Sequence, residues 1–233
     1  MNLNSELESI LKEHGASLVG FADITQLPDE VTGGFPRAVS IGVALNPTIA
    51  REISEGPTRP YYAEYQRVND LLAKLCERAA HILTEAGYRA EAVRATTEKF
   101  DPATLSTRTQ HKSIATRAGL GWIGKSALLI TKEYGPAVRF GSVLTNAEFV
   151  TGESIDASHC GDCRKCVDRC PAGAIIGHNW SVGDPREAIY DAFACRDMAT
   201  KLSGNQGIVS TICGICINAC PWTQRYISHE SSR

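Results

Sequence analysis

An α+β fold in two parts is predicted by two features of the sequence. Over about the first 150 residues, segments with a helical period alternate with short β-branched segments, which is typical of a mixed helix and strand domain. Eight of the nine cysteines lie between residues 160 and 220, so the last third of the chain has a composition of its own. We therefore expect two domains, residues 1–150 and residues 151–233.

The expected elements follow from hydrophobic period and from Gly and Pro. Leu7, Ile10 and Leu11 share one face of a helix over residues 4–14, which Gly15 ends. Further helices are expected over residues 61–86, 113–118 and 185–201, and a loop over residues 46–60. Strands are expected over residues 17–21, 38–45, 88–95, 127–131 and 137–145, with a turn at residues 132–136 joining the last two.

The cysteines of the last third follow a metal-binding pattern in two runs. The first run has the spacing C-x2-C-x2-C-x3-C-P, with which bacterial ferredoxins bind a [4Fe-4S] cluster, and it consists of Cys160, Cys163, Cys166, Cys170 and Pro171. The second run keeps only C-x2-C-x3-C-P, with one thiol further upstream, and it consists of Cys195, Cys213, Cys216, Cys220 and Pro221. Eight thiols suit two clusters and predict an electron-transfer protein.

The spacing also predicts how two clusters share these thiols, because in two-cluster ferredoxins the fourth cysteine of each run binds the other cluster. We expect one cluster on Cys160, Cys163, Cys166 and Cys220, and the other on Cys195, Cys213, Cys216 and Cys170. Zinc and a disulfide framework are the alternatives, and the repeated spacing and the lack of a secretory signal disfavour them. The ninth thiol, Cys76, lies in a helical apolar stripe and is expected in the core.

A glycine-rich segment, residues 117–126, satisfies two phosphate-binding patterns at once. Gly119 to Ser126 fits G-x4-G-K-[ST], and the three glycines fit G-x-G-x-x-G. Both motifs need a strand before the glycines and a helix after them. Here a polar helix is expected before and a β-like run after, so a turn packed on the sheet is favoured over a nucleotide site.

This segment and the cysteines together resemble a known family. HKSIATRAGLGWIGKSALLITKEYGPAVRFGSVLT, followed by CGDCRKCVDRCPAGAI, is similar to epoxyqueuosine reductase, a cobalamin-dependent enzyme with two [4Fe-4S] clusters, and more distantly to reductive dehalogenases. The resemblance implies a nitroreductase-like α/β corrinoid-binding core over residues 1–150. It also implies that the corrin site is lined by Gly119, Gly121, Trp122, Gly124 and Lys125, with Lys125 meeting a corrin amide or the nucleotide-tail phosphate.

The chemistry of such a site would be reductive. Low-potential clusters suit the reduction of Co(II) to Co(I). The D-x-H-x-x-G pattern that supplies a histidine to cobalt is absent, and His159 comes closest to it, so we expect cobalt without a protein imidazole. The family's acidic proton donor falls on Leu105 here, which leaves Asp101 or a phenol as the candidate donor. The phenols considered are Tyr61, Tyr62, Tyr65 and Tyr134.

Composition narrows the partners. The formal net charge is -2, with no long Lys/Arg tract, no apolar run of membrane-spanning length and no basic leader. We expect the protein to lack the helical-repeat domain that helps full-length members of the family bind tRNA. We expect a cytoplasmic protein that takes electrons from a low-potential donor such as ferredoxin or flavodoxin and acts on a small molecule or a corrinoid. We expect neither tRNA nor a membrane as a partner. Three functions stay open: a corrinoid-dependent reductase, a corrinoid-reducing or corrinoid-delivering protein, and a ferredoxin-like carrier.

Overall fold

The computed structural model describes residues 2–95 and 100–230, and the chain divides into two compact units. The core unit comprises residues 1–44, 68–121 and 139–155, and the cysteine unit comprises residues 45–67, 122–138 and 156–233. The division differs from the expected break near residue 150, because two segments that precede this break, residues 45–67 and 122–138, join the cysteines. This difference was invisible in the sequence, since it depends on contacts between distant residues.

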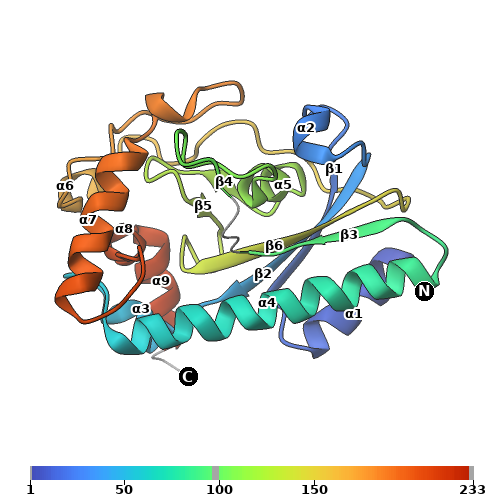
Figure 1. The fold of residues 1–233 in the computed structure, drawn as a ribbon, viewed down its shortest axis with the longest axis horizontal. Coiled ribbons are helices and arrows are strands. Elements are labelled where there is room, and N and C mark those ends of the chain that lie inside the picture. Colours follow the sequence, from blue (N-terminus) through green and yellow to red (C-terminus); the bar gives the residue numbers. More distant parts are fainter. Residues whose placement is uncertain (1, 96–99, 231–233) are drawn as a thin grey trace. The chain divides into compact units, whose positions relative to one another are not determined.

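The core unit is a four-stranded sheet with helices (Figure 1). The strand order is β1-β2-β6-β3, and the β1–β2 and β3–β6 pairs are antiparallel, with Leu18 opposite Gly42 and Ala90 opposite Thr145. The elements are α1 Leu3–Glu13, β1 Leu18–Asp23, α2 Asp29–Thr32, β2 Arg37–Ala44, the greater part of α4 Arg59–Glu85, β3 Ala90–Val93, α5 His111–Arg117 and nearly all of β6 Val138–Thr145.

Successive residues of β6 face opposite sides of the sheet. A Cβ atom on Gly141 would lie 2.5 Å from the Sγ atom of Cys76 in α4. The next residue, Ser142, places its Oγ atom 2.9 Å from Nδ1 of His111, the first residue of α5. The sheet is therefore covered by α4 on one face and by α5 on the other (Figure 1).

The cysteine unit consists mostly of short elements. They are α3 Pro47–Arg51, β4 Trp122–Ile123, β5 Leu129–Ile130, α6 Lys165–Arg169, the 3-10 helix η1 Arg186–Ala188, α7 Ala192–Asn205, α8 Ile215–Ala219 and α9 Pro221–Glu230, together with the first residues of α4. In the described part of the chain, no helix has an apolar stretch long enough to cross a membrane.

Most expected elements are confirmed, and the differences have local causes. The helix expected over residues 185–201 divides into η1 and α7, because the Asp191 side chain accepts hydrogen bonds from the Phe193 and Ala194 amides and starts a new helix. The loop expected over residues 46–60 contains α3, which Asn46 caps and Pro47 begins. The strand expected over residues 127–131 is only β5, and it pairs with β4.

Cys76 is a core residue, as the sequence predicts. Its side chain is 1% exposed, and burial, with a smaller effect from Glu77, raises the pKa of the Cys76 thiol to about 12. A thiol with this pKa stays protonated at neutral pH and is inert.

Gly141→Ala should lower the free energy of unfolding by ~1–3 kcal/mol, because the new methyl group would overlap the sulfur atom of the buried Cys76. Chemical denaturation of four proteins checks this: wild type, Gly141→Ala, Cys76→Ala and the double variant. The cost of the Gly141 change should shrink in the Cys76→Ala background, where the sulfur is gone. Equal costs in both backgrounds would show that the close approach has no energetic weight.

His111 predicts a pH dependence of stability. Its Nε2 donates to the Arg94 carbonyl at 2.9 Å, so Nδ1 is free to accept from the Ser142 hydroxyl. Burial of the ring, with a smaller effect from Arg139, lowers the pKa of His111 to about 4, against 6.5 for an ordinary histidine. The unfolded chain therefore binds a proton more readily than the folded chain between these two values.

The stability that neutral His111 contributes is complete above pH 6.5 and is lost as the pH falls toward 4. Between about pH 7.5 and about pH 5.5, wild type should lose ~1 kcal/mol more than His111→Gln, which cannot titrate. Anaerobic denaturation at the two pH values measures the difference. Parallel losses in both proteins would contradict it.

Candidate metal centre

The two cysteine runs fold into the same local structure. The first run leads into α6 and ends at Cys170, and the second leads into α8 and ends at Cys220; α6 and α8 pack together. Both terminal cysteines are extended, with φ, ψ of -72°, 111° at Cys170 and -69°, 129° at Cys220, and each is followed by a proline. Each helix therefore ends just before its Cys-Pro pair, and the terminal cysteine does not continue the helix of its own run.

A cavity of about 230 Å³ brings thiols from both runs together. The cysteines that line it are Cys160, Cys163, Cys166 and Cys220. These are the four that the spacing assigns to one cluster, three from the first run and the last from the second. Lys125, His159, Trp222 and Arg225 also line the cavity.

The other four thiols also lie near one another. Burial raises the pKa of Cys195, and the nearby thiols of Cys170 and Cys213 raise it further, followed by the Asp191 carboxylate. Burial likewise raises the pKa of Cys216, with Cys213 and Cys195 as the strongest neighbouring groups. Cys170 thus lies with thiols of the second run, as the crossed assignment requires.

The donor set fits iron–sulfur clusters. All nine cysteines are free thiols, so the disulfide alternative is wrong. Burial also raises the pKa of Cys166 and of Cys220 to about 11, so bare thiols here are protonated, and a cationic metal core would compensate by binding them as thiolates. In the described residues no three His, Cys, Asp or Glu side chains converge on one ion; a cubane does not require this, because its thiolates bind four different irons.

The glycines of residues 117–126 are required by the packing of the chain itself. A Cβ atom on Gly119, whose φ is +71°, would lie 2.7 Å from the Glu153 carbonyl oxygen. A Cβ atom on Gly124 would lie 2.7 Å from Cγ1 of Ile130 and 3.4 Å from Sγ of Cys160. The segment follows helix α5 and leads into the β4–β5 pair, so the strand–loop–helix arrangement of a phosphate loop is not formed.

Lys125 lines the cavity that contains Cys160, and Trp122 contacts His159, another residue of the cavity wall. The Lys125 side chain is 5% exposed, and its Nζ atom donates to the carbonyls of Gly161 at 2.7 Å and Cys163 at 3.1 Å. The Trp122 ring stacks on His159 with centroids 4.8 Å apart and meets Trp222 edge-on at 5.4 Å. Both residues were expected to line a corrin, and the structure gives each of them contacts beside Cys160.

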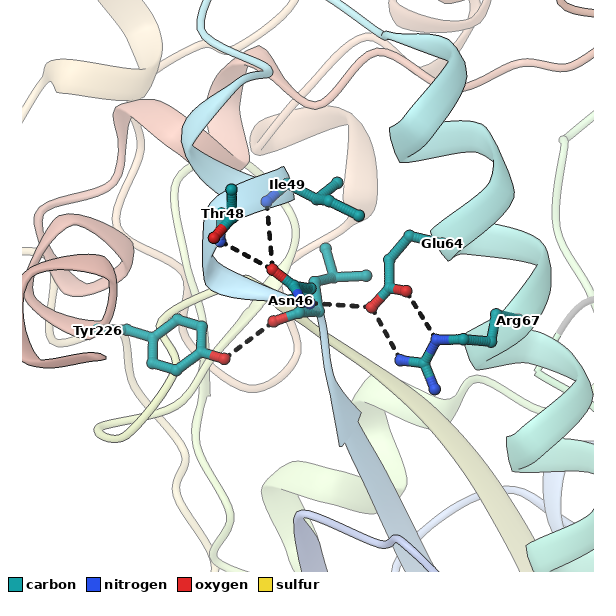
Figure 2. A network of polar contacts seen from close by, with 7 residues as sticks. Asn46, Thr48, Ile49, Glu64, Arg67 and Tyr226 are labelled. Atoms are coloured by element: carbon teal, nitrogen blue, oxygen red, sulfur yellow. Dashed lines mark hydrogen bonds and ion pairs between the residues drawn. The ribbon is translucent and has the colours of Figure 1, made fainter. Parts of the chain in front are cut away.

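Residues 45–67 support the second run of cysteines. This supporting role was not predicted from the sequence. The side-chain oxygen of Asn46 accepts hydrogen bonds from the backbone amides of Thr48 and Ile49 and starts α3 (Figure 2). The backbone amide of Asn46 donates to the Glu64 carboxylate at 2.9 Å. Glu64 is 6% exposed, and its pKa is lowered mainly because Arg67 donates two hydrogen bonds to its carboxylate. Tyr226 of α9 donates to the Leu45 carbonyl at 2.9 Å, so this network ties α3, α4 and α9 together (Figure 2).

Helix α3 in turn contacts the second run. The Asn218 amide group in α8 donates to the carbonyls of Ala50 and Arg51 at 2.9 and 3.1 Å. A Cβ atom on Gly214, between Cys213 and Cys216, would lie 2.7 Å from Cδ1 of Ile53. The only sequence signal for α3 was the Asn-Pro start at residues 46–47.

The candidate proton donors receive little support. The Asp101 carboxylate is fully exposed and accepts hydrogen bonds from the Ala103 amide and the Thr104 hydroxyl, both at 2.9 Å, which lower its pKa. A carboxyl group held in its ionised form is a poor acid. Leu105, at the expected donor position, closes this turn with φ of +52°. Of the phenols, Tyr61 is 4% exposed and Tyr134 packs edge-on against Tyr226.

Comparison with known proteins now gives these features a family context. Residues 159–223 match the family described as the 4Fe-4S double cluster binding domain. The epoxyqueuosine reductase of Atelocyanobacterium thalassa is 39% identical over 119 residues, and that of Synechocystis sp. is 37% identical over 120 residues. Half of this chain is homologous to epoxyqueuosine reductases. The matches cover 50% of this chain but only 38% and 40% of those relatives.

Solved structures of epoxyqueuosine reductase and of reductive dehalogenases share the fold. A catabolic reductive dehalogenase in complex with 3-bromo-4-hydroxybenzoic acid has a TM-score of 0.71 at 20% identity, over 93% of this chain and 31% of that one. A reductive dehalogenase described as B12-dependent has a TM-score of 0.68 at 19% identity, over 96% and 33%. An epoxyqueuosine reductase with a tRNA-Tyr stem loop has a TM-score of 0.62 at 20% identity, over 95% and 65%.

Crossed ligation predicts which cluster each terminal cysteine affects. Cys220→Ala should disrupt the cluster on Cys160, Cys163 and Cys166, and Cys170→Ala should disrupt the other. EPR of anaerobically prepared, dithionite-reduced protein should show the signal lost in Cys220→Ala to be the one lost in Cys163→Ala.

Iron and sulfide analysis supplies the control. Cys76→Ala should keep about eight irons and eight sulfides per chain, as wild type should, because its thiol is in the core. If Cys220→Ala and Cys216→Ala lose the same signal, the crossed assignment is wrong.

Proposed function

We propose that this protein is a cobalamin-dependent reductase in which two [4Fe-4S] clusters deliver low-potential electrons to cobalt. The observation that carries the proposal is the grouping of eight partly buried thiols. Four of them line one cavity and include Cys220 from the second run, while Cys170 lies near thiols of the second run. In this proposal Cys160, Cys163, Cys166 and Cys220 hold one cluster, and Cys170, Cys195, Cys213 and Cys216 hold the second. A low-potential donor such as ferredoxin or flavodoxin would supply the electrons.

The corrinoid part of the proposal rests on resemblance. Epoxyqueuosine reductases are similar to half of this chain, at 39% identity in one case, and a reductive dehalogenase described as B12-dependent shares the fold. Four of the five residues assigned to the corrin are committed to the protein's own contacts: Gly119, Trp122, Gly124 and Lys125. Gly121 is buried between them in the sequence and is the best probe of the site. Bound cobalamin would supply a reducible cobalt centre.

For the substrate, we propose a small molecule rather than tRNA. The formal net charge of -2 and the lack of a long basic tract give no electrostatic footprint for a phosphate backbone. An epoxyqueuosine reductase bound to a tRNA stem loop shares the fold, so tRNA is the comparison substrate for any assay.

A second candidate is a protein that reduces or delivers cobalamin without an organic substrate. The environment of the expected acid favours it, because Leu105 stands at the donor position and Asp101 is held ionised. Reduction of cobalt needs an electron and no proton, so this function does not require the missing acid.

Cobalamin binding by the anaerobic, cluster-loaded protein tests both candidates. We expect one cob(II)alamin per chain, and an EPR spectrum without splitting from an axial nitrogen. Gly121→Val should abolish binding with both clusters retained. Gly204→Ala is the matched control, because its methyl group would meet no atom within 4 Å. Full clusters without cobalamin binding would contradict both candidates and leave a ferredoxin-like carrier.

Organic turnover separates the two candidates. Consumption of a halogenated or epoxide-bearing small molecule with reduced cobalamin bound would establish the reductase. Co(I) formation without turnover of such compounds or of epoxyqueuosine-modified tRNA favours cobalamin handling.

A further inference from the structure

The cavity lined by Cys160, Cys163, Cys166 and Cys220 contains one buried cation among its described residues, the ammonium group of Lys125. Arg225 and His159 also line this cavity, but both are exposed, whereas the Lys125 side chain is 5% exposed. Its two hydrogen-bond acceptors, Gly161 and Cys163, belong to the loop that carries the first three thiols. The charge therefore lies within hydrogen-bonding distance of the backbone that positions these thiols.

Within the described ranges no carboxylate forms an ion pair with Lys125. Carbonyl dipoles solvate an ammonium group only in part, and a buried charge without an opposite charge is costly. The four thiols of the same cavity, once bound to iron as thiolates, supply the missing negative charge. The lysine and the cluster are then each other's counter-ions.

Such a pairing acts on redox chemistry. Four thiolates give an oxidised [4Fe-4S] cluster a net negative charge, and reduction adds one electron to it. A nearby buried cation favours the reduced form, and the low local dielectric strengthens the effect. The second set has the opposite neighbour, since the Asp191 carboxylate lies near Cys195.

We propose that Lys125 raises the reduction potential of the cluster on Cys160, Cys163, Cys166 and Cys220 above that of the second cluster. In each step an external low-potential donor loses one electron, and the first cluster gains it directly or through the second. Electrons entering the pair therefore collect at the first cluster. This inference rests on the two clusters of the proposed function and is independent of the corrinoid.

Lys125→Gln tests the charge, because the amide can still donate to the two carbonyls but carries no charge. EPR-monitored dithionite titration of the cluster-loaded protein should show one of two midpoint potentials shifted downward. At a fixed potential, the ratio of reduced to oxidised first cluster should fall about tenfold, which is about 59 mV for a one-electron couple. Lys125→Arg should restore the wild-type potential.

Lys132→Gln is the matched control, since Lys132 lies in the same unit, is exposed and does not line the cavity. If neither potential moves in Lys125→Gln, or both move equally, the inference is wrong. Should this variant lose its first cluster, wild type decides, because a single midpoint for both clusters overturns the inference. Wild type without clusters would overturn the proposed function as well, and iron and sulfide analysis distinguishes that outcome.

Discussion

The packing of the two cysteine runs against each other is the constraint on which the cysteine unit depends. Helices α6 and α8 pack together, and each ends in an extended Cys-Pro pair. In the proposed crossed assignment each run gives three thiols to one cluster and one to the other, so each cluster would require both runs to be folded. Because thiols with raised pKa values bind metal only as thiolates, assembly of the metal centre and folding of this unit are coupled. The intervening α7 carries Cys195, the upstream thiol of the second run.

Two segments that precede both cysteine runs in the sequence, residues 45–67 and 122–138, complete this unit. Helix α3 holds the second run through Asn218, and Lys125 holds the first run through the Gly161 and Cys163 carbonyls. Glu64 holds the start of α3 by accepting a hydrogen bond from the Asn46 backbone amide (Figure 2). The negative charge of this buried carboxylate is balanced by Arg67. The metal centre is thus supported symmetrically, with one outside segment for each cysteine run.

Local signals explain what the sequence could predict. Helical period predicted α1 and α4. Cysteine spacing predicted that Cys160, Cys163, Cys166 and Cys220 come together, and these four line one cavity, whereas the ligation of two clusters stays a prediction. The Asp191 cap was a readable signal for the start of α7 that the helix prediction overlooked. The supporting role of α3 and the position of Lys125 could not be predicted, because both depend on hydrogen bonds across more than thirty residues. The nitroreductase-like character of the core stays a prediction from resemblance.

Electrons and protons are treated differently by this chain. Eight thiols, a buried lysine and two supporting segments surround the place where electrons would be held. For protons, the turn at Asp101 keeps its carboxylate ionised, and Leu105 occupies a left-handed conformation that costs ~1 kcal/mol for a residue other than glycine. Reduction of an organic substrate at carbon consumes a proton with each electron pair, whereas reduction of cobalt does not. The proton therefore decides between the two proposed functions: a reductase must take it from a phenol, from solvent or from the substrate, and a cobalamin-handling protein needs none.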